Sequence, residues 1–545
     1  MSFSFYDYLI FVVYIITIVG VGLWVSRSKK GHQKDSKDYF LAGNTLPWWA
    51  IGASLIAANI SAEQFIGMSG SGFAIGLAIA SYEWMAALTL IIVGKYFLPI
   101  FIEKKLFTIP EFIEQRFSTN LKTILAIFWV ALFIFVNLTS VLFLGGKAID
   151  TIIGAGDGSL IFYAILGLAF IAAAYSIYGG LSAVAWTDVL QVALLVVGGL
   201  ITTFIALDHV TVEGGIFNGL SHLYETAGEK FHMILSRDNP EYFNLPGIAV
   251  LIGGMWVANL YYWGFNQYII QRTLAAKSLK EAQRGIVFAG FLKLIIPILV
   301  VIPGIVAFVL FMQPEGTAII PGVKEAFAKN GGGINYDKAY PWLVSVFIPN
   351  GIKGLVVAAL TAAIVSSLAS MLNSTSTIFT MDIYKPYFGK NASEKRLVFV
   401  GRLAAFAALV IAVAMAPLLG NIPQMFQYIQ EYTGLVSPGI LAVFLMGLFW
   451  KKTTNKAAIW GIILSFFVAL FLKSPSVDLP WMDQMFYTML ITMAIIVGFS
   501  LTASDDVDDP KGIPLTAKIF RTDSVFNIGA YAIILVLIAL YSFFW

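Results

Sequence analysis

The sequence contains no cysteine and few charged residues. Only 12% of its 545 residues are Asp, Glu, Lys or Arg, about half the share in soluble domains, which is too few for an ordinary water-exposed surface. The lack of cysteine excludes disulfides, thiolate nucleophiles and cysteine-ligated metals. The four histidines fall in polar stretches, which argues against a histidine-based metal or catalytic site. A net charge of +3 is too small for a nucleic-acid-binding surface, so no nucleic acid partner is expected.

Long apolar runs dominate the chain, and 59% of its residues are hydrophobic. A run of about 20 apolar residues can cross the hydrocarbon core of a bilayer as a helix. We therefore expect an all-α polytopic membrane protein with fourteen transmembrane helices, in contact with the lipid bilayer. The expected spans are 5–26, 47–68, 76–102, 121–147, 160–178, 186–207, 246–268, 282–311, 352–384, 397–418, 424–449, 457–473, 482–502 and 524–545. No linker divides them, which predicts a single domain over 1–545.

The connections between these runs differ in positive charge. Those on one side of the fourteen-span arrangement carry 24 Lys and Arg residues, and those on the other side carry 8. Because Lys and Arg concentrate on the cytoplasmic side, both termini are predicted to lie outside. The two longest connections, 208–245 and 312–351, are then also outside. The apolar stretch 340–348 is too short to span and is expected to lie at the membrane interface.

Polar residues interrupt the second apolar run. Four polar side chains lie between Asn59 and Gln64, and an ionisable group at bilayer depth costs roughly 2.5–3.5 kcal/mol unless it faces a cavity or a partner. This stretch predicts a helix that breaks near the midplane and frees backbone carbonyls. Gly253-Gly254 marks a weak point in the seventh run, five helices later. That interval is consistent with two inverted repeats, spans 2–6 and 7–11.

A set of polar and aromatic residues predicts a solute site if their helices converge. The polar members are Gln64, Glu83, Asn259, Lys293 and Gln430, and the aromatic members are Tyr82, Tyr262 and Phe426. Charged and amide groups suit the hydroxyls of a neutral polyhydroxyl solute, and aromatic rings can cover its faces. A structural Glu–Lys pair surrounded by ordinary packing is an equally open interpretation of these residues.

Hydroxyl side chains gather in the ninth run, around Ser366 and Ser367. Most hydroxyl residues in membrane helices allow close packing and bond to their own backbone. If these two serines face the broken second run, their oxygens suit an alkali cation. Trapped water would satisfy the same oxygens, so this pattern alone leaves both interpretations open.

Several longer motifs occur along the whole chain. They are residues 59–67 (NISAEQFIG), 175–181 (YSIYGGL), 186–189 (WTDV), 258–267 (ANLYYWGFNQ), 366–374 (SSLASMLNS) and 426–434 (FQYIQEYTG). These motifs resemble the solute:sodium symporter family, especially its bacterial sugar-transporting members. The resemblance implies a leucine-transporter-like core of two inverted five-helix repeats, 47–207 and 246–450. One extra helix, 5–26, would precede this core and three, within 457–545, would follow it. The resemblance also implies a multi-pass protein of the bacterial cytoplasmic (inner) membrane.

The resemblance also implies roles for individual residues. The side chains that would hydrogen-bond a hexose are Gln64, Glu83, Asn259, Lys293 and Gln430. Tyr262 would stack beneath the sugar as an inner gate, and the outer gate would consist of Met68, Tyr82 and Phe426. Sodium would bind the carbonyls of Ala57, Ile60 and Ala363 and the hydroxyls of Ser366 and Ser367. Asp188 would lie near the ion's exit path, and Ala86 replaces an expected sugar-contacting serine.

The predicted function is sodium-coupled uptake of a hexose such as galactose or glucose by alternating access, with sodium as the only cofactor and no enzymatic activity. One alternative keeps the fold but transports an amino acid, a carboxylate or sialic acid. An anionic solute should require a cation without an adjacent carboxylate, whereas Glu83 and Lys293 are expected together. A channel or solute sensor is an alternative of another class, although a sensor should carry a signalling domain. The oligomeric state is not predicted.

Overall fold

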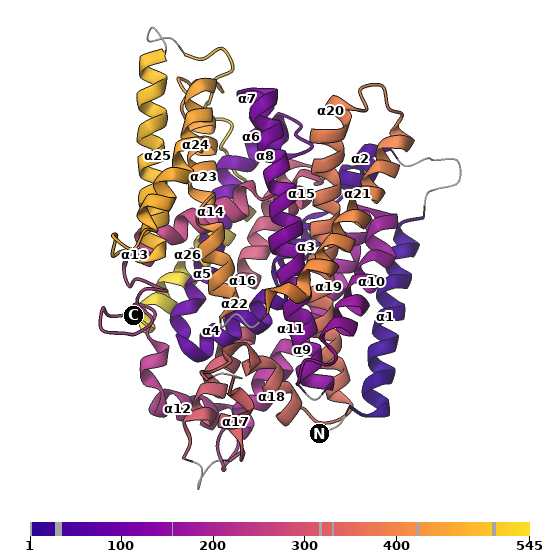
Figure 1. The fold of residues 1–545 in the computed structure, drawn as a ribbon, viewed down its shortest axis with the longest axis vertical. Coiled ribbons are helices and arrows are strands. Elements are labelled where there is room, and N and C mark those ends of the chain that lie inside the picture. The colour runs from indigo at the N-terminus through magenta and orange to yellow at the C-terminus, as the bar shows by residue number, and fades with distance from the viewer. Residues whose placement is uncertain are drawn as a thin grey trace.

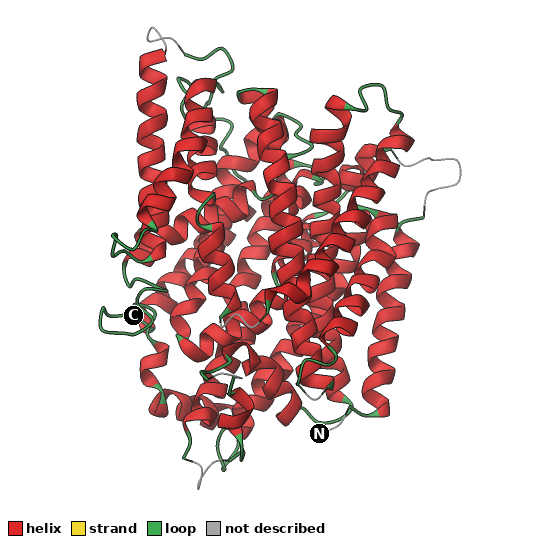
Figure 2. Ribbon diagram, viewed as in Figure 1, coloured by secondary structure: helices red, strands yellow, loops and turns green. Residues whose placement is uncertain are grey.

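The structure is a computed structural model that describes residues 3–27, 35–154, 156–314, 319–329, 332–420, 424–503 and 508–545. Helices make up most of this described part, which contains no β-strand (Figure 2). Within it, eleven helical segments are long and apolar enough to cross a bilayer, or twelve if one bent pair counts as a span. The prediction of an all-α polytopic membrane protein is therefore confirmed. Lys29, Lys30 and Lys34 of the first connection lie outside the described residues.

The eleven segments coincide with predicted apolar runs. Seven of them are single helices: α1 (Phe5–Val25), α10 (Ile161–Gly179), α11 (Leu181–His209), α16 (Leu279–Met312), α24 (Asn455–Leu472), α25 (Trp481–Ala503) and α26 (Ser524–Phe543). The other four each consist of helices that follow one another without a gap: η3 (Leu77–Ala80), α5 (Ser81–Ile92), η4 (Val93–Phe97) and α6 (Leu98–Glu103); α8 (Thr119–Leu132), η5 (Phe133–Leu138) and α9 (Thr139–Ile153); α19 (Ile352–Ile378), η8 (Phe379–Tyr384) and α20 (Lys385–Tyr387); and α21 (Glu394–Met415) with η9 (Ala416–Leu419). Shorter connecting helices are α2 (Ser36–Leu41), η1 (Ala42–Asn44), α7 (Ile109–Arg116), α12 (Ile216–Thr226), η6 (Gly228–Phe231), α17 (Val323–Phe327), η7 (Tyr336–Lys338) and α18 (Ala339–Phe347).

The second predicted run is an interrupted helix, as expected. Its parts are α3 (Trp48–Asn59), the π-helical turn η2 (Glu63–Met68) and α4 (Ser69–Ala74). Ile60 leaves the helix in an extended conformation, with φ −77° and ψ 106°. Polar side chains compensate part of the interrupted backbone: the Ser61 N–H donates to Gln64 Oε1 at 2.9 Å, and the Glu63 N–H donates to Ser61 Oγ at 3.0 Å. These polar side chains thus supply hydrogen bonds that the interrupted helix no longer makes and that lipid cannot supply.

The seventh predicted run is interrupted twice. Its parts are α13 (Ala249–Ile252), α14 (Gly254–Phe265) and α15 (Gln267–Leu274). The first interruption lies at Gly253, as predicted, and a Cβ on Gly254 would lie 2.2 Å from the Met482 carbonyl oxygen, so the glycine permits close packing. The second interruption, at Asn266 with ψ 120°, was not predicted. The helix then continues past 268, and Arg272, which the sequence placed in a connection, is fully buried.

A third interrupted helix consists of α22 (Met425–Thr433) and α23 (Ser437–Phe449), which are bent by 49° relative to each other. The bend lies just before Pro438, whose ring cannot continue the hydrogen-bond ladder of α22. The bend turns α22 away from the axis of α23, and α22 packs against η2 of the second run.

The connections separate into two ends of the helix bundle. The lysine-rich connections with α7 and α20 lie at one end, whereas α12, α17 and α18 lie at the other end with the N-terminus (Figure 1). Asp7 Oδ1 accepts hydrogen bonds from the Gly351 and Gly354 N–H groups at 2.8 and 2.6 Å. His232 Nδ1 lies 3.0 Å from the Trp545 carbonyl oxygen. Each chain end therefore lies beside one of the two long connections, and we call this end of the bundle, which was predicted to face outside, the outer end.

The apolar stretch 340–348 differs from its prediction. It forms most of α18, which is largely buried among other helices instead of lying at a lipid interface. The Tyr340 hydroxyl donates to Thr202 Oγ1 at 3.0 Å, and its ring contacts Phe65 with centroids 5.1 Å apart. Pairing of the tyrosine hydroxyl with a buried threonine explains why this stretch prefers the protein interior.

At the opposite end, Arg116 connects α7 to the carboxyl end of α23. Its guanidinium is fully buried and donates to four carbonyl oxygens, those of Gly447 (3.0 Å), Trp450 (3.3 Å), Lys451 (3.2 Å) and Thr453 (2.9 Å). The last carbonyls of a helix have no partner within that helix, and a cation there also complements the helix dipole.

Replacement of Arg116 by methionine should therefore destabilise the protein. The four carbonyls would lose their buried donor, and we expect a loss of about 3 kcal/mol in the free energy of unfolding. The melting temperature of the detergent-solubilised variant measures this effect. Arg521→Met removes an exposed arginine and is the matched control. Equal melting temperatures of the two variants would show that the Arg116 contacts contribute no net stability.

Candidate functional site

A polar cavity of about 50 Å³ lies beside the break in the second run. Its lining residues come from α3, η2, α5, α14, α16 and α22: Asn59, Glu63, Gln64, Tyr82, Glu83, Ala86, Ala258, Asn259, Tyr262, Trp263, Lys293, Phe426 and Gln430. All five residues predicted to hydrogen-bond a solute are among them, and so is Tyr262, which was predicted to stack on it. The convergence of Gln64, Glu83, Asn259, Lys293 and Gln430 is therefore confirmed, although their roles remain predictions.

A buried ion pair crosses this cavity. Lys293 Nζ on α16 donates to Glu83 Oε2 on α5 and to Asn59 Oδ1 at the end of α3. The two charged side chains are 1% and 4% exposed, so each charge depends on the other for compensation. Lys293 Nζ also lies 5.0 Å from the ring centroid of Trp263. These mutual contacts hold the cavity well below the roughly 300–1,000 Å³ of a typical ligand pocket.

Tyrosine side chains cover the cavity toward the end opposite the outer end. The Tyr262 hydroxyl accepts a hydrogen bond from Asn59 Nδ2 at 2.9 Å and lies 2.6 Å from the Tyr268 hydroxyl. Tyr262 belongs to α14, whereas Tyr268 follows the interruption at Asn266. The hydroxyl contact therefore joins the two sides of that interruption directly beneath the cavity.

Two aromatic rings pack together in the lining of the cavity. Tyr82 and Phe426 pack edge to face with centroids 5.0 Å apart, and both are buried. Met68, predicted as a third gate residue, is fully buried at the end of η2 but does not line the cavity. The tyrosine and phenylalanine, two of the three predicted outer-gate residues, therefore lie side by side in the cavity lining.

A second cluster of oxygens lies where α19 crosses the carboxyl end of α3. Ser367 Oγ donates to the Ala58 carbonyl at 2.8 Å and lies 3.5 Å from the Ala57 carbonyl oxygen. Ile60 is buried at the break, and Ala363 is buried one turn before the serines on α19. The predicted contact of the ninth run with the broken second run is therefore confirmed. Hydroxyl and carbonyl oxygens are the ligand types that hard cations prefer.

Asp188 belongs to this oxygen cluster. Ser366 Oγ donates to Asp188 Oδ1 at 2.5 Å, and Ser54 Oγ donates to Asp188 Oδ2 at 2.5 Å. Arg272 Nη2 lies 3.8 Å from the same carboxylate, and both side chains are fully buried. The carboxylate was predicted near an ion path, and the structure places it in direct contact with the predicted sodium-binding serine.

The two clusters share one short segment of chain. Ala57 and Ala58 present carbonyls to the α19 serines, and the next residue, Asn59, contacts both Lys293 and Tyr262. A shift of these backbone carbonyls therefore moves a residue that lines the cavity. The two clusters are therefore connected through three consecutive residues of the chain.

Three residues at the site had not been assigned roles from the sequence. Asn59 connects the ion pair to Tyr262, Trp263 lies beneath the Lys293 ammonium, and Arg272 neutralises Asp188. For Asn59, the presence of a polar amide in an apolar run was a signal from which a role at the site could have been predicted. Trp263 had no feature that distinguishes it from other aromatic residues, and Arg272 was missed because its helix was expected to end earlier.

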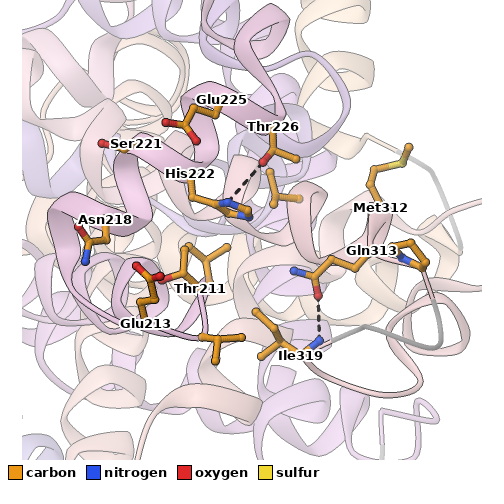
Figure 3. A pocket seen from close by; sticks show the side chains of 14 residues that line it. Thr211, Glu213, Asn218, Ser221, His222, Glu225, Thr226, Met312, Gln313 and Ile319 are labelled. Carbon is orange, nitrogen blue, oxygen red and sulfur yellow. Dashed lines mark hydrogen bonds between the residues drawn. The ribbon is translucent and has the colours of Figure 1, made fainter.

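A larger pocket of about 660 Å³ lies at the outer end, between α12 and the end of α16. Figure 3 shows its polar side chains, among them Glu213, His222 and Gln313. It shares no lining residue with the polar cavity. It is therefore separate from the site that the sequence predicted.

Comparison with known proteins identifies the family. The model of the "Sodium:solute symporter family" matches residues 39–465. A "Sodium/glucose cotransporter" of Vibrio parahaemolyticus is 64% identical over 542 residues, which cover 99% of this chain and 98% of that protein. A human "Sodium/myo-inositol cotransporter 2" is 35% identical and covers 85% of this chain and 69% of its own length. A solved structure of a Na⁺-coupled sialic acid symporter in an outward-open state has a TM-score of 0.77 at 24% identity, with coverage of 92% and 98%.

The chain belongs to the sodium:solute symporter family. It is a sodium-coupled transporter and not an enzyme, and sodium is its coupling ion. The predicted family, the class of function and the cofactor are thereby confirmed.

Replacement of Ser366 by alanine should raise the sodium concentration needed for half-maximal uptake. Loss of one oxygen from the cluster should weaken ion binding by about 1–2 kcal/mol, or about 5- to 30-fold. Sodium titration of transport measures this change. Ser376→Ala is the matched control, because Ser376 is also buried on α19 but donates to the Gly401 carbonyl. An unchanged sodium requirement in Ser366→Ala would remove Ser366 from the proposed ion site.

Proposed function

We propose that the protein takes up a hexose such as galactose or glucose together with Na⁺, by alternating access. The observation that carries this proposal is that Lys293, the one cation in the described lining of the cavity, is paired with Glu83. The other polar groups of the lining are amides, tyrosine hydroxyls and the carboxyl of Glu63, which accepts a hydrogen bond from Ser140. A neutral solute rich in hydroxyls can bond to such groups without leaving a charge unpaired. The 64% identity to a protein named a sodium/glucose cotransporter supports the same solute.

The sugar would replace the contacts that the lining residues now make with one another. Lys293 offers further N–H donors, Glu83 accepts hydroxyl donors, and the amides both donate and accept. In this arrangement the sugar-bonding residues are Gln64, Glu83, Asn259, Lys293 and Gln430. Binding would push these side chains apart and enlarge the cavity. The energy of the present contacts is then exchanged for contacts with sugar hydroxyls of similar strength.

The gates would be the residues that cover the cavity on its two sides. Tyr82 and Phe426 would separate as the outer gate, and Met68 would support them from η2. Tyr262 would stack on the sugar and, with its bonds to Asn59 and Tyr268 broken, open the opposite side. The interruption at Asn266 gives Tyr262 and the following helix α15 room to move relative to each other.

Sodium would bind the oxygens between α3 and α19. The proposed ligands are the carbonyls of Ala57, Ile60 and Ala363 and the hydroxyls of Ser366 and Ser367. Asp188 would receive the departing ion, since it already bonds to Ser366. One positive charge moving through 100 mV supplies ~2.3 kcal/mol, and a tenfold sodium gradient supplies ~1.4 kcal/mol more. Together they support a several-hundred-fold sugar accumulation at 1:1 coupling.

We propose fourteen spans in the membrane, in which the three interrupted helices join the eleven continuous segments. A core of two inverted five-helix repeats, leucine-transporter-like, would comprise 47–207 and 246–450. The helix at 5–26 would precede this core, and three helices within 457–545 would follow it. The lysine-rich connections favour a cytoplasmic position for their end, which puts both termini outside a bacterial inner membrane.

The main alternative solute class is anionic or zwitterionic. An amino acid, a carboxylate or sialic acid would need an unpaired cation, and the described lining of the cavity offers only Lys293, already paired with Glu83. Another neutral polyol is a closer competitor, because one relative is named a sodium/myo-inositol cotransporter. Ala86 lines the cavity where a serine was expected, so one hydroxyl contact is absent, a difference of about 0.5–1.5 kcal/mol in sugar affinity.

Uptake into proteoliposomes tests this proposal. Labelled galactose or glucose should accumulate when an inward Na⁺ gradient is present and should not accumulate under a proton gradient alone. Lys293→Ala should abolish uptake, since it leaves Glu83 buried without a partner and removes a sugar contact. The matched control, Lys277→Ala, changes an exposed lysine and should transport normally.

In a second experiment, unlabelled sugars and amino acids are tested as competitors of the uptake of the labelled hexose. Competition by hexoses, and none by amino acids or sialic acid, is the expected outcome. Sodium-driven uptake of myo-inositol with no hexose uptake would assign a different polyol. Accumulation driven by protons without Na⁺ would contradict the proposed coupling.

A further inference from the structure

Gln267 is a fully buried glutamine that the transport cycle proposed above does not use. It ends the motif 258–267 and begins α15, directly after the interruption at Asn266. Its amide bonds to the turn before α7: the Ile109 N–H donates to Gln267 Oε1 at 2.8 Å, and Gln267 Nε2 donates to the Phe107 carbonyl at 3.4 Å. Ile109 is the first residue of α7, so its N–H has no partner within that helix. We call the end of the bundle where α7 lies the inner end.

The turn before α7 is itself held in place by side-chain hydrogen bonds. Thr108 Oγ1 donates to Asp382 Oδ1 of η8 at 3.0 Å and accepts from the Glu111 N–H at 3.2 Å. The Phe107 N–H donates to Glu111 Oε2 at 2.7 Å. Thr108 and Asp382 are both buried. A helix that is attached to this turn is therefore attached to α7 and to the segment that continues α19.

Gln267 is adjacent to a residue that contacts the cavity lining. The next residue is Tyr268, whose hydroxyl lies 2.6 Å from the Tyr262 hydroxyl and whose ring packs edge to face on Phe133. Asn266, with ψ 120°, interrupts the backbone ladder between α14 and α15. The start of α15 is therefore positioned by side-chain contacts, and the amide bonds of Gln267 help to fix where Tyr268 meets Tyr262.

All eight residues of α15 are buried, although four of them, Gln267, Gln271, Arg272 and Thr273, are polar. Gln271 and Arg272 bond to α2, α3 and α19. Polar groups exchange such bonds for bonds to water at a small net cost, whereas exposure of a similar apolar surface costs more. The polar composition of α15 therefore suits a helix that is buried in one state of the protein and hydrated in another.

We propose that the Gln267 amide clamps α15 to the turn 107–109 and so holds the cavity closed toward the inner end. Gln267 is a positioning residue, since it acts through Tyr268 and belongs to neither the proposed sugar site nor the proposed sodium site. Opening of the inner side requires the amide to release Ile109 and Phe107, whose backbone groups then bond to water. This inference rests on the proposed alternating access with Tyr262 as the inner gate.

Gln267→Met tests the clamp, because methionine has a similar length and no amide. The backbone groups of Ile109 and Phe107 then lack a partner only while the inner side is closed, since water reaches them when it is open. The equilibrium should therefore shift about tenfold toward the open inner side. Ile109→Pro removes the donor of the same bond, and proline is favoured at the first position of a helix. The double variant should shift the equilibrium no further than either single variant.

The absence of cysteine from the chain allows opening to be measured with one introduced thiol. Thr273→Cys places this thiol on α15, where the side chain is fully buried, so a maleimide reacts with it after α15 separates from its neighbours. In detergent-solubilised protein, Gln267→Met and Ile109→Pro should each raise its labelling rate about tenfold. Thr203→Cys, at a fully buried position of α11, reports general unfolding and should be labelled at the same rate in every variant.

Two variants serve as matched controls and should leave the labelling of Thr273→Cys unchanged. Gln283→Met changes another buried glutamine, whose amide donates to the Gly94 carbonyl at 3.0 Å, and Ile109→Val keeps the N–H that Gln267 accepts. Labelling that is no faster in Gln267→Met and Ile109→Pro than in the controls would overturn the clamp. An equal rise at Thr203→Cys would overturn it as well, because the effect would then be general unfolding. Absence of hexose uptake by the unmodified protein would instead contradict the proposed function.

Discussion

The interruption of the second helix at Ile60 is the constraint on which the site depends. Backbone groups released from a helix inside a bilayer have no water to bond with, and each unsatisfied group costs several kcal/mol. Here the Gln64 and Ser61 side chains bond to the freed N–H groups, and Ser367 donates to the Ala58 carbonyl. The side chains that bond to the interrupted backbone thus place oxygen atoms on one side of Asn59 and amide groups on the other. The proposed ion site and the proposed solute site lie next to each other because of this one local geometry.

Two ion pairs are fully buried in the core. Lys293 pairs with Glu83 at the cavity, and Arg272 pairs with Asp188 at the oxygen cluster. Each pair joins helices from different parts of the chain, so neither charge can move alone without a large desolvation cost. Since the only cation in the described lining of the cavity is paired with a carboxylate, the cavity favours a neutral solute over an anionic one. The family to which the chain belongs couples sodium to solute.

The sequence was most informative where polar residues stand in apolar runs. Glu83, Lys293 and Gln430 are costly in lipid, and that cost marked them as candidates, whereas their placement in one site was implied by the family resemblance. The break at Ile60 was predictable from the same cost. The burial of α18 and of Arg272 was not predictable, because it depends on tertiary partners, Thr202 and Asp188, that lie far away in the chain. Met68 has no polar atom to orient it, so its place behind the cavity lining could not be inferred, and the interruption at Asn266 lacks a glycine or proline signal.

Sodium and sugar binding to the purified protein test the central claim, that the break at Ile60 couples the two sites. Calorimetric titration of hexose in the presence and absence of Na⁺ measures the coupling directly, without a membrane or a gradient. The geometry predicts that Na⁺ tightens hexose binding by about 5- to 150-fold and that hexose tightens Na⁺ binding by the same factor. Hexose affinity that is the same with and without Na⁺ would contradict coupling through this segment.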